Sequence, residues 1–410
     1  MTSLIRTHLS MLCCLLAARS GYCGSVDIPS TSMPTEPHGP NWVTGERVNL
    51  GGVFFPHFHF NAVYGGTTIE DGHEAAAGHH DPITDGWTIQ GFEAGLSGRF
   101  GDHFEAFGVG HLSQDAESKD WTLEAEEYFG KLKNLPGGLE LRGGRYLNRI
   151  GLHNAVHQHG WDVSDNDLMS GRILGDDGLF SMGGELSWTL PLNSIQWQSV
   201  LSLSVGDAQP ETHEEHAGKG PEPRFEADEA AWHSTLTTIN WTTIYNLNDF
   251  HQFRFGASAI FGENGWDRQS TIVGAHASYQ WRENGLELGG RYSRWNTEVM
   301  YRDIEALTTE VRPKAGSFSE WGFYTQAIYG APTAFAGPLE MGLRTDYVQG
   351  VSDADLPERW RLTPSIRLFA NAQRTASLAL HYNYDDFVGH GSEHSLWLSF
   401  GLNWGGPEVR

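Results

Sequence analysis

The chain has 410 residues, among them 50 glycines and 15 tryptophans, while only 19% of its residues are charged. A sequence this rich in aromatic side chains is expected to fold, which excludes an intrinsically disordered protein. No run of about 18 apolar residues occurs, so an ordinary transmembrane helix is also excluded. The net charge of −24 disfavours nucleic acid as a partner and favours cations.

The first two dozen residues have the composition of a secretory leader. Arg6 is the only early charge, an unbroken apolar run follows at 11–18, and small residues surround positions 20–24. All three cysteines lie within this leader. We therefore expect an exported protein with neither a disulfide framework nor a thiolate metal site in its mature part.

Beyond residue 50, stretches of about ten residues alternate apolar with polar side chains, which is typical of strands whose two faces meet different surroundings. The last stretch, at 395–404, shows the alternation most clearly. In chain order, sixteen strands are predicted at 53–64, 87–99, 103–111, 121–132, 139–149, 182–190, 195–205, 233–246, 250–261, 270–281, 285–296, 317–329, 338–349, 359–369, 376–386 and 395–404.

The connections between these strands alternate in length. Long connections are predicted at 65–86, 150–181, 206–232 and 297–316, while most others are short and contain turn-forming residues. An even number of antiparallel strands with tight turns at one end and long loops at the other is typical of an outer-membrane β-barrel. We therefore predict an all-β chain with a signal peptide at 1–24, a periplasmic segment at 25–51, the barrel at 52–404 and a tail at 405–410.

A soluble β-sandwich is the alternative, and the two faces of the strands argue against it. Tryptophans near strand ends lie on the apolar face, as in the aromatic girdles of membrane barrels, at positions 87, 121, 188, 197, 241, 281, 321, 360 and 404. The opposite face carries too many charges for a dry interior, so a water-filled lumen is expected. The predicted pore-lining residues are Glu93, Glu124, Glu126, Glu185, Arg254, His276, Arg291, Arg344, Arg361 and Arg367.

Histidines and acids gather in the long connections. Imidazole and carboxylate together suit divalent ions such as zinc, although acidic, histidine-bearing loops are also compatible with simple solvation. We predict that His73, His79, His80, His213 and His216 bind zinc at the extracellular loops. A second zinc-binding site, nearer the pore, is predicted at His153, His157 and His159. The connection 150–181 is long for a structureless loop, so we expect it to be functional, and the sequence leaves open whether it folds inward and narrows the pore.

The stretches Gly144–Asn154, His157–Asp162 and Gly178–Pro191 resemble a family of outer-membrane barrel proteins known as zinc-regulated, which lack a plug domain. The similarity extends more weakly to Phe92–Tyr128 and to the barrel as a whole. The resemblance implies placement in the outer membrane of a Gram-negative bacterium and a link to zinc supply, and it leaves the transported species open.

These observations predict a porin-like channel that admits small polar or cationic solutes and aids uptake of zinc or other divalent cations. No catalytic residues and no required cofactor are expected, beyond zinc bound at the loops. Expected partners are outer-membrane lipid and the barrel-assembly machinery, and a homo-oligomer is compatible with the pattern. The alternatives are a non-conducting surface metal-binding protein or adhesin and, less favoured, an outer-membrane hydrolase.

Overall fold

The structure is a computed structural model. It describes residues 50–69, 77–78, 81–82, 85–114, 120–175, 178–192, 194–208, 224–225, 230–285, 289–309, 312, 314–334, 336–389 and 391–405. The predicted leader, nearly all of the predicted periplasmic segment and the tail at 406–410 lie outside these residues. The same holds for the histidines predicted at the extracellular loops, His73, His79, His80, His213 and His216.

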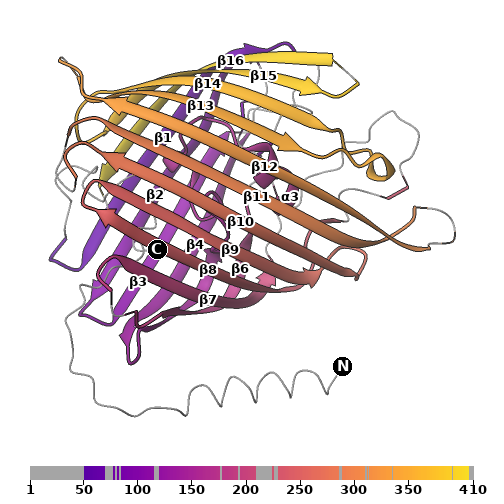
Figure 1. Cartoon of the computed structure of the whole chain (residues 1–410), viewed down its shortest axis with the longest axis horizontal. Coiled ribbons are helices and arrows are strands. Elements are labelled where there is room, and N and C mark those ends of the chain that lie inside the picture. Colours follow the sequence, from indigo (N-terminus) through magenta and orange to yellow (C-terminus); the bar gives the residue numbers. More distant parts are fainter. Residues whose placement is uncertain are drawn as a thin grey trace. The chain divides into compact units, whose positions relative to one another are not determined.

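Sixteen antiparallel strands form one closed barrel, in which the first strand pairs with the last (Figure 1). The strands are β1 (Phe54–Thr67), β2 (Gly86–Phe100), β3 (Phe104–Gln114), β4 (Trp121–Leu135), β5 (Leu139–Leu147), β6 (Phe180–Thr189), β7 (Trp197–Ala208), β8 (Thr235–Asn248), β9 (His251–Glu263), β10 (Gln269–Arg282), β11 (Tyr292–Leu307), β12 (Ala315–Ala331), β13 (Leu339–Val348), β14 (Arg359–Phe369), β15 (Ala376–Phe387) and β16 (Gly391–Gly405). The predicted fold class and strand number are confirmed.

The boundaries around the segment 297–316 are wrong. The segment 297–316 was expected to be a long loop, but β11 continues to Leu307 and β12 starts at Ala315. Charged side chains such as Arg302 suggest a loop in the sequence, yet Arg302 is buried inside the barrel, where its Nε donates to Glu320 Oε1 at 2.9 Å. The alternation of buried and exposed side chains therefore continues, with Arg302 on the inner face and Asp303 and Glu305 on the exposed face.

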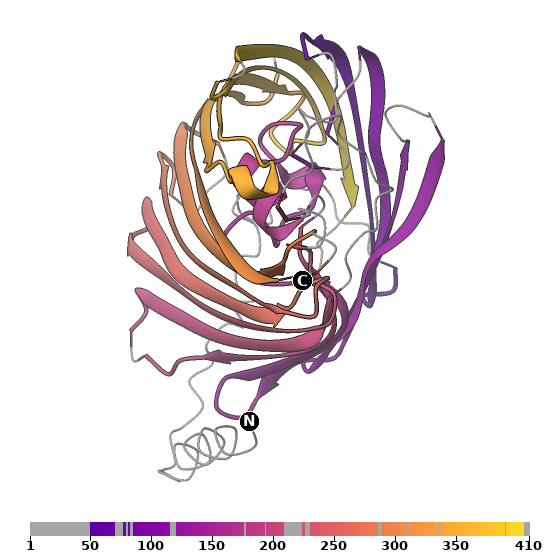
Figure 2. The same cartoon turned by 90° about the vertical axis from the view of Figure 1, so that its right-hand side faces the viewer.

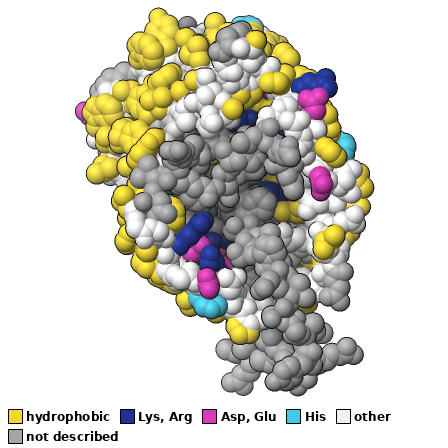
Figure 3. Space-filling view, turned by 90° about the vertical axis from the view of Figure 1, so that its left-hand side faces the viewer, with side chains coloured by type: hydrophobic (Ala, Val, Ile, Leu, Met, Phe, Trp, Pro, Cys, Tyr) yellow, Lys and Arg dark blue, Asp and Glu magenta, His cyan; other side chains and the backbone are white. Residues whose placement is uncertain are grey.

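The outer wall of the barrel is apolar. Eight of the nine tryptophans predicted for this face are exposed, and Trp281 is half-buried. Leucine, isoleucine and phenylalanine side chains fill the exposed positions between them, and hydrophobic atoms line much of the edge of the barrel seen end-on (Figure 3). An apolar exterior on a closed barrel is the arrangement that lipid requires.

The connection between β5 and β6 lies inside the barrel (Figure 2). It contains the short helices η1 (Gln158–Gly160) and α3 (Leu168–Leu174), and Asp167 caps α3 by accepting from Ser170 N at 2.8 Å. We call residues 148–179 the inserted segment. Its helix α3 packs against β11, β12 and β13 with buried Met169 and Ile173, so part of the interior is an apolar core.

A single further short helix, η3 (Ser352–Ala354), lies between β13 and β14 in the described part of the chain. None of the helices formed by the described residues is both long and apolar enough to cross a membrane.

Candidate functional site

The inserted segment lies between two differently charged parts of the inner wall. One part, on β13 and β14, carries arginines and is called the arginine wall; it is defined by Arg344, Arg359, Arg361 and Arg367. The other, on β1 to β4, carries histidines and glutamates. We call it the histidine–glutamate cluster, and it comprises His57, His59, Glu93, His111, Glu126 and Glu127 with His157 and His159 of the inserted segment.

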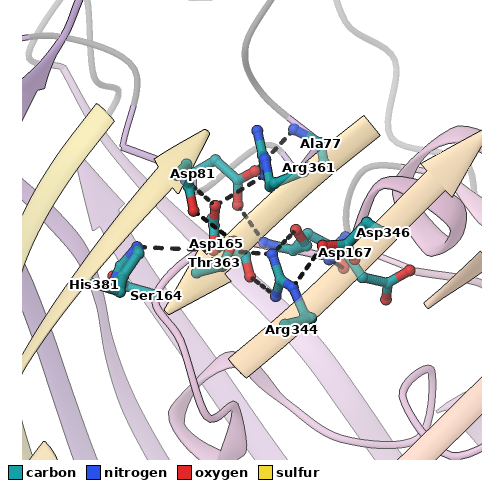
Figure 4. Close-up of polar contacts among 12 residues, drawn as sticks. Ala77, Asp81, Ser164, Asp165, Asp167, Arg344, Asp346, Arg361, Thr363 and His381 are labelled. Atoms are coloured by element: carbon teal, nitrogen blue, oxygen red, sulfur yellow. Dashed lines mark hydrogen bonds and ion pairs between the residues drawn. The ribbon is translucent and has the colours of Figure 1, made fainter. Parts of the chain in front are cut away.

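Asp165 anchors the inserted segment to the arginine wall (Figure 4). Its Oδ1 lies 3.1 Å from Arg344 Nη2 and its Oδ2 lies 2.9 Å from Arg361 Nη1. Asn383 Nδ2 also donates to Oδ2, at 2.6 Å. Burial alone would raise the pKa of Asp165, but the two guanidinium groups outweigh it and hold that pKa well below its ordinary value. The carboxylate is therefore a fixed negative charge.

Two further arginines hold the turn before Asp165, at residues 161–162, against neighbouring strands. Arg367 Nη2 donates to the carbonyl oxygens of Trp161 and Asp162, at 2.9 and 2.8 Å. Arg294 on β11 forms a buried ion pair with the Asp162 carboxylate. Charge-assisted bonds to both the backbone and the side chain fix the height of this turn in the lumen.

Part of the connection between β1 and β2 lies on the inserted segment (Figure 4). Asp81 Oδ1 accepts from Asn166 N at 2.8 Å, and Asp81 Oδ2 accepts from Ala77 N and Gly78 N at 2.8 and 3.0 Å. Burial, with the nearby charge of Asp165, raises the pKa of Asp81 to about 7. Gly171 allows the close approach, because a Cβ there would lie 1.6 Å from Ala77 O.

His157 lies at the centre of the histidine–glutamate cluster and contacts three carboxylates. Its Nδ1 is 2.8 Å from Glu126 Oε2 and 3.3 Å from Glu93 Oε2. On the other side of the ring, Nε2 is 2.9 Å from Glu127 Oε2. Both nitrogens therefore contact carboxylates. Because the ring is buried, neither nitrogen faces bulk water.

His159 completes this group from the same segment. Its Nδ1 lies 2.9 Å from Glu93 Oε2, the oxygen that also approaches His157. The ring stacks on His59, with centroids 3.6 Å apart and planes at 2°. His59 Nδ1 in turn lies 2.8 Å from Asn403 Oδ1, which fixes the orientation of the stacked pair.

Glycines on both sides of Glu93 make room for the histidines. A Cβ on Gly91 would lie 1.9 Å from Nε2 of His111, and a Cβ on Gly95 would lie 2.0 Å from Nε2 of His57. Larger side chains on this face of β2 would push the imidazoles out of the cluster. The local sequence is therefore suited to holding several rings around one carboxylate.

Most predicted pore-lining residues do lie on the inner face. Glu93, Glu185, His276, Arg344 and Arg361 are buried there, and Glu124, Glu126, Arg254 and Arg367 are half-buried. Many are paired rather than solvated; Glu185, for example, lies 2.9 Å from Arg142 Nη2 and 3.3 Å from Arg149 Nη1.

Arg291 is the exception. It precedes β11, is 54% exposed and pairs with Glu283 at the hairpin between β10 and β11. The prediction assumed that a strand began at 285, whereas β11 begins only at Tyr292. Arg291 therefore lies outside the strand, and alternation does not give its side chain an inward direction. Arg294, three residues later, is an inward basic residue of this strand, as Arg302 is further along it.

The sequence reasoning also missed Glu127 and His111. Glu127 has the parity of the lipid face, but a β-bulge shifts the register of β3 and β4 beside Gly110 and leaves Glu126 without a partner residue across the pair. Glu126 and Glu127 therefore both face inward, which strict alternation could not reveal. The adjacent pair of acids on one strand is the only sequence signal of this break.

The structure brings together two of the three histidines predicted for the inner metal site and places the third apart. His157 and His159 meet at Glu93, and these three residues bring their ligand atoms within 4.8 Å of one another. His153 lies elsewhere, with its Nε2 2.8 Å from Asn166 Oδ1 and its ring against Trp161. Burial lowers the pKa of His153, so this ring stays neutral at physiological pH. The group that could hold a metal thus excludes His153 and includes glutamates of the wall.

No family model matches the chain, and no curated protein sequence matches it. Among solved structures, OprB of Pseudomonas putida is similar with a TM-score of 0.55 at 11% identity, covering 86% of this chain and 94% of that one. The outer membrane channel DcaP of Acinetobacter baumannii is similar with a TM-score of 0.51 at 10% identity, covering 87% and 99%. The chain has the fold of outer-membrane porin-like barrels. With its apolar exterior, this fold indicates the outer membrane of a Gram-negative bacterium.

Proposed function

We propose that the protein is an outer-membrane channel for small polar and cationic solutes. The observation that carries this proposal is the interior of the closed barrel, which has charged side chains on opposite walls and an inserted segment held between them. Barrels of about sixteen strands are wide enough for an aqueous path. An inward connection narrows such a path and makes passage depend on the size and charge of the solute.

The finer proposal is that the channel aids uptake of zinc or other divalent cations. It is supported by the histidines and acids in the connections 65–86 and 206–232, which would concentrate cations at one mouth. The resemblance to zinc-regulated outer-membrane proteins points the same way. Assembly by the barrel-assembly machinery and formation of a homo-oligomer stay predictions.

Planar-bilayer recording of the purified, refolded chain tests the channel. We expect ion conductance with a weak preference for potassium over chloride, strongest at low salt, because screening at 0.1 M already acts within about 10 Å. A matched variant with Glu70, Asp71 and Glu74 changed to glutamine should lose part of that preference. Chloride preferred over potassium at low ionic strength would contradict the proposed selectivity.

The alternative is a non-conducting metal-binding barrel, and one observation favours it. The apolar core around α3 fills part of the interior and joins the inserted segment to β8, β9, β10, β11, β12 and β13. A refolded protein that shows heat-modifiable gel migration but no conductance would support this alternative over the channel.

A further inference from the structure

The ligand atoms of the histidine–glutamate cluster have the arrangement of a metal site. Glu93 Oε2 lies 2.9 Å from His159 Nδ1 and 3.3 Å from His157 Nδ1, and Glu126 Oε2 lies 2.8 Å from the same His157 nitrogen. Three donor atoms, from β2 and the inserted segment, thus lie within 4.8 Å of one another, and Glu126 of β4 joins them through its contact with His157. Metal-bound nitrogen and oxygen ligands stand about 2.0 to 2.2 Å from zinc, so small side-chain movements would make room for the ion.

The charges of the cluster also call for a cation. Glu93 and Glu126 are largely withdrawn from water, and in the described part of the chain their ion-pair partners are imidazole rings. A divalent ion would place positive charge beside the two carboxylates and take mixed nitrogen and oxygen ligands, as zinc and its neighbours in the first transition row do.

The atoms behind the ligands are placed as in known metal centres. When His157 Nδ1 faces the ion, its Nε2–H donates to Glu127 Oε2 at 2.9 Å. A carboxylate on the far side of a ligating histidine fixes the tautomer and the ring plane. In the same way His111 Nδ1 lies 3.2 Å from Glu126 Oε1 and leaves Oε2 for the ion. The acids of this wall would then be used either as ligands or as supports of ligands.

From these contacts we infer that Glu93, Glu126, His157 and His159 bind one divalent transition-metal ion of the zinc class inside the barrel. Bound there, the ion joins the inserted segment to β2 and β4. The site is open enough for the metal ion to exchange with the lumen, since the side chains of His159 and Glu126 keep 11% and 16% of their surface exposed. A role of this site in uptake rests on the proposed channel, whereas binding itself does not.

The test uses the full chain in detergent with the rim histidines His73, His79, His80, His213 and His216 changed to alanine, so that binding at the mouth is removed. Calorimetry with Zn²⁺ after removal of metal by a chelator should show one ion per chain. Changing His157 and His159 to alanine in this background should abolish that binding. His153→Ala is the matched control, because it removes an imidazole from the same segment outside the cluster.

A second variant tests the supporting carboxylate. Glu127→Gln keeps the size of the side chain but removes the charge behind His157, and zinc affinity should fall roughly 10- to 100-fold. Heat-modifiable gel migration of every variant checks that the barrel has folded. With Co²⁺ in place of Zn²⁺, the visible spectrum should change in Glu127→Gln and stay unchanged in His153→Ala.

Three outcomes would overturn the inference: a folded, rim-substituted chain that binds no zinc, equal loss of affinity in His153→Ala and in the double variant, or a Co²⁺ spectrum insensitive to His157 and His159. Conductance of the same preparations separates this result from the channel proposal. Conductance without zinc binding would overturn only the site, and zinc binding without conductance would overturn only the channel.

Discussion

The arginine wall and the histidine–glutamate cluster hold the same inserted segment by different chemistry. On β13 and β14, Asp165 meets two guanidinium groups, which stay charged at any physiological pH. On β2 and β4, His157 meets carboxylates through imidazole nitrogens, whose charge depends on a proton or a metal ion. One side is therefore a constant anchor, and the other responds to its surroundings.

The two sides also differ in how far their charges are balanced. Arg344 and Arg361 have further acids beside them, with Asp346 Oδ2 2.9 Å from Arg344 Nε and Asp385 Oδ1 2.9 Å from Arg361 Nε. The opposite wall carries three carboxylates around His157. The charge of the histidine–glutamate cluster thus depends on its imidazoles, whereas the arginines of the opposite wall are paired with acids at fixed positions.

The largest expected effect comes from removing the constant anchor. Asp165→Asn should leave two buried guanidinium groups short of charge and cost roughly 3 to 5 kcal/mol of segment docking. We expect protease sensitivity to appear within residues 148–179 and single-channel conductance to rise. Asp102→Asn, in the turn between β2 and β3, is the control substitution. Unchanged protease resistance in Asp165→Asn would show that the apolar contacts of α3 hold the segment alone.

A smaller effect is expected from pH at Asp81. Because burial raises its pKa from 3.8 to about 7, the docked form binds a proton that the undocked form has lost. Docking of Ala77, Gly78 and Asp81 is therefore strongest below about pH 4 and weakens as the pH rises towards 7. Hydrogen exchange at the Asn166 and Ala77 amides, corrected for intrinsic rates, should show this loss of protection. The same pH slope in Asp81→Asn would contradict the assignment.

The smallest effect is expected at the exposed pair of Glu283 and Arg291. Hydrogen bonds from Arg291 lower the pKa of Glu283 to about 2, yet both side chains are open to solvent. Exposed pairs contribute little to stability. Arg291→Met should therefore leave the thermal midpoint and the conductance unchanged. A clear fall in either one would mean that this hairpin takes part in the channel after all.

The barrel could be predicted because lipid imposes one rule on every strand. Each outward position must be apolar, so residues such as Leu396 and Leu398 repeat at period two and identify strands without any knowledge of their neighbours. The rule fails where the exposed face of a strand carries charges, as it does at Asp303 and Glu305 near the end of β11. For that reason Arg302 and its surroundings on β11 were assigned to a loop.

The candidate site was only partly predictable. His157 and His159 stand out in the sequence, but their partner Glu93 is about sixty residues away and meets them only because the connection folds inward. Asp165 lies in the same connection, yet its partners, Arg344 and Arg361, lie nearly two hundred residues later. Pairings of this range depend on how the barrel closes, which local periodicity does not encode.

The bulge in β4 has a consequence for how this chain tolerates insertions and deletions. In a regular strand, losing one residue turns every later side chain from the lumen to the lipid. Glu126 is the residue that the partner strand skips, with exposed Ala125 before it and buried Glu127 after it. Its deletion would restore plain alternation and keep both neighbours on their present faces. Position 126 is thus a place where one codon can be lost without moving lumen-facing side chains to the lipid.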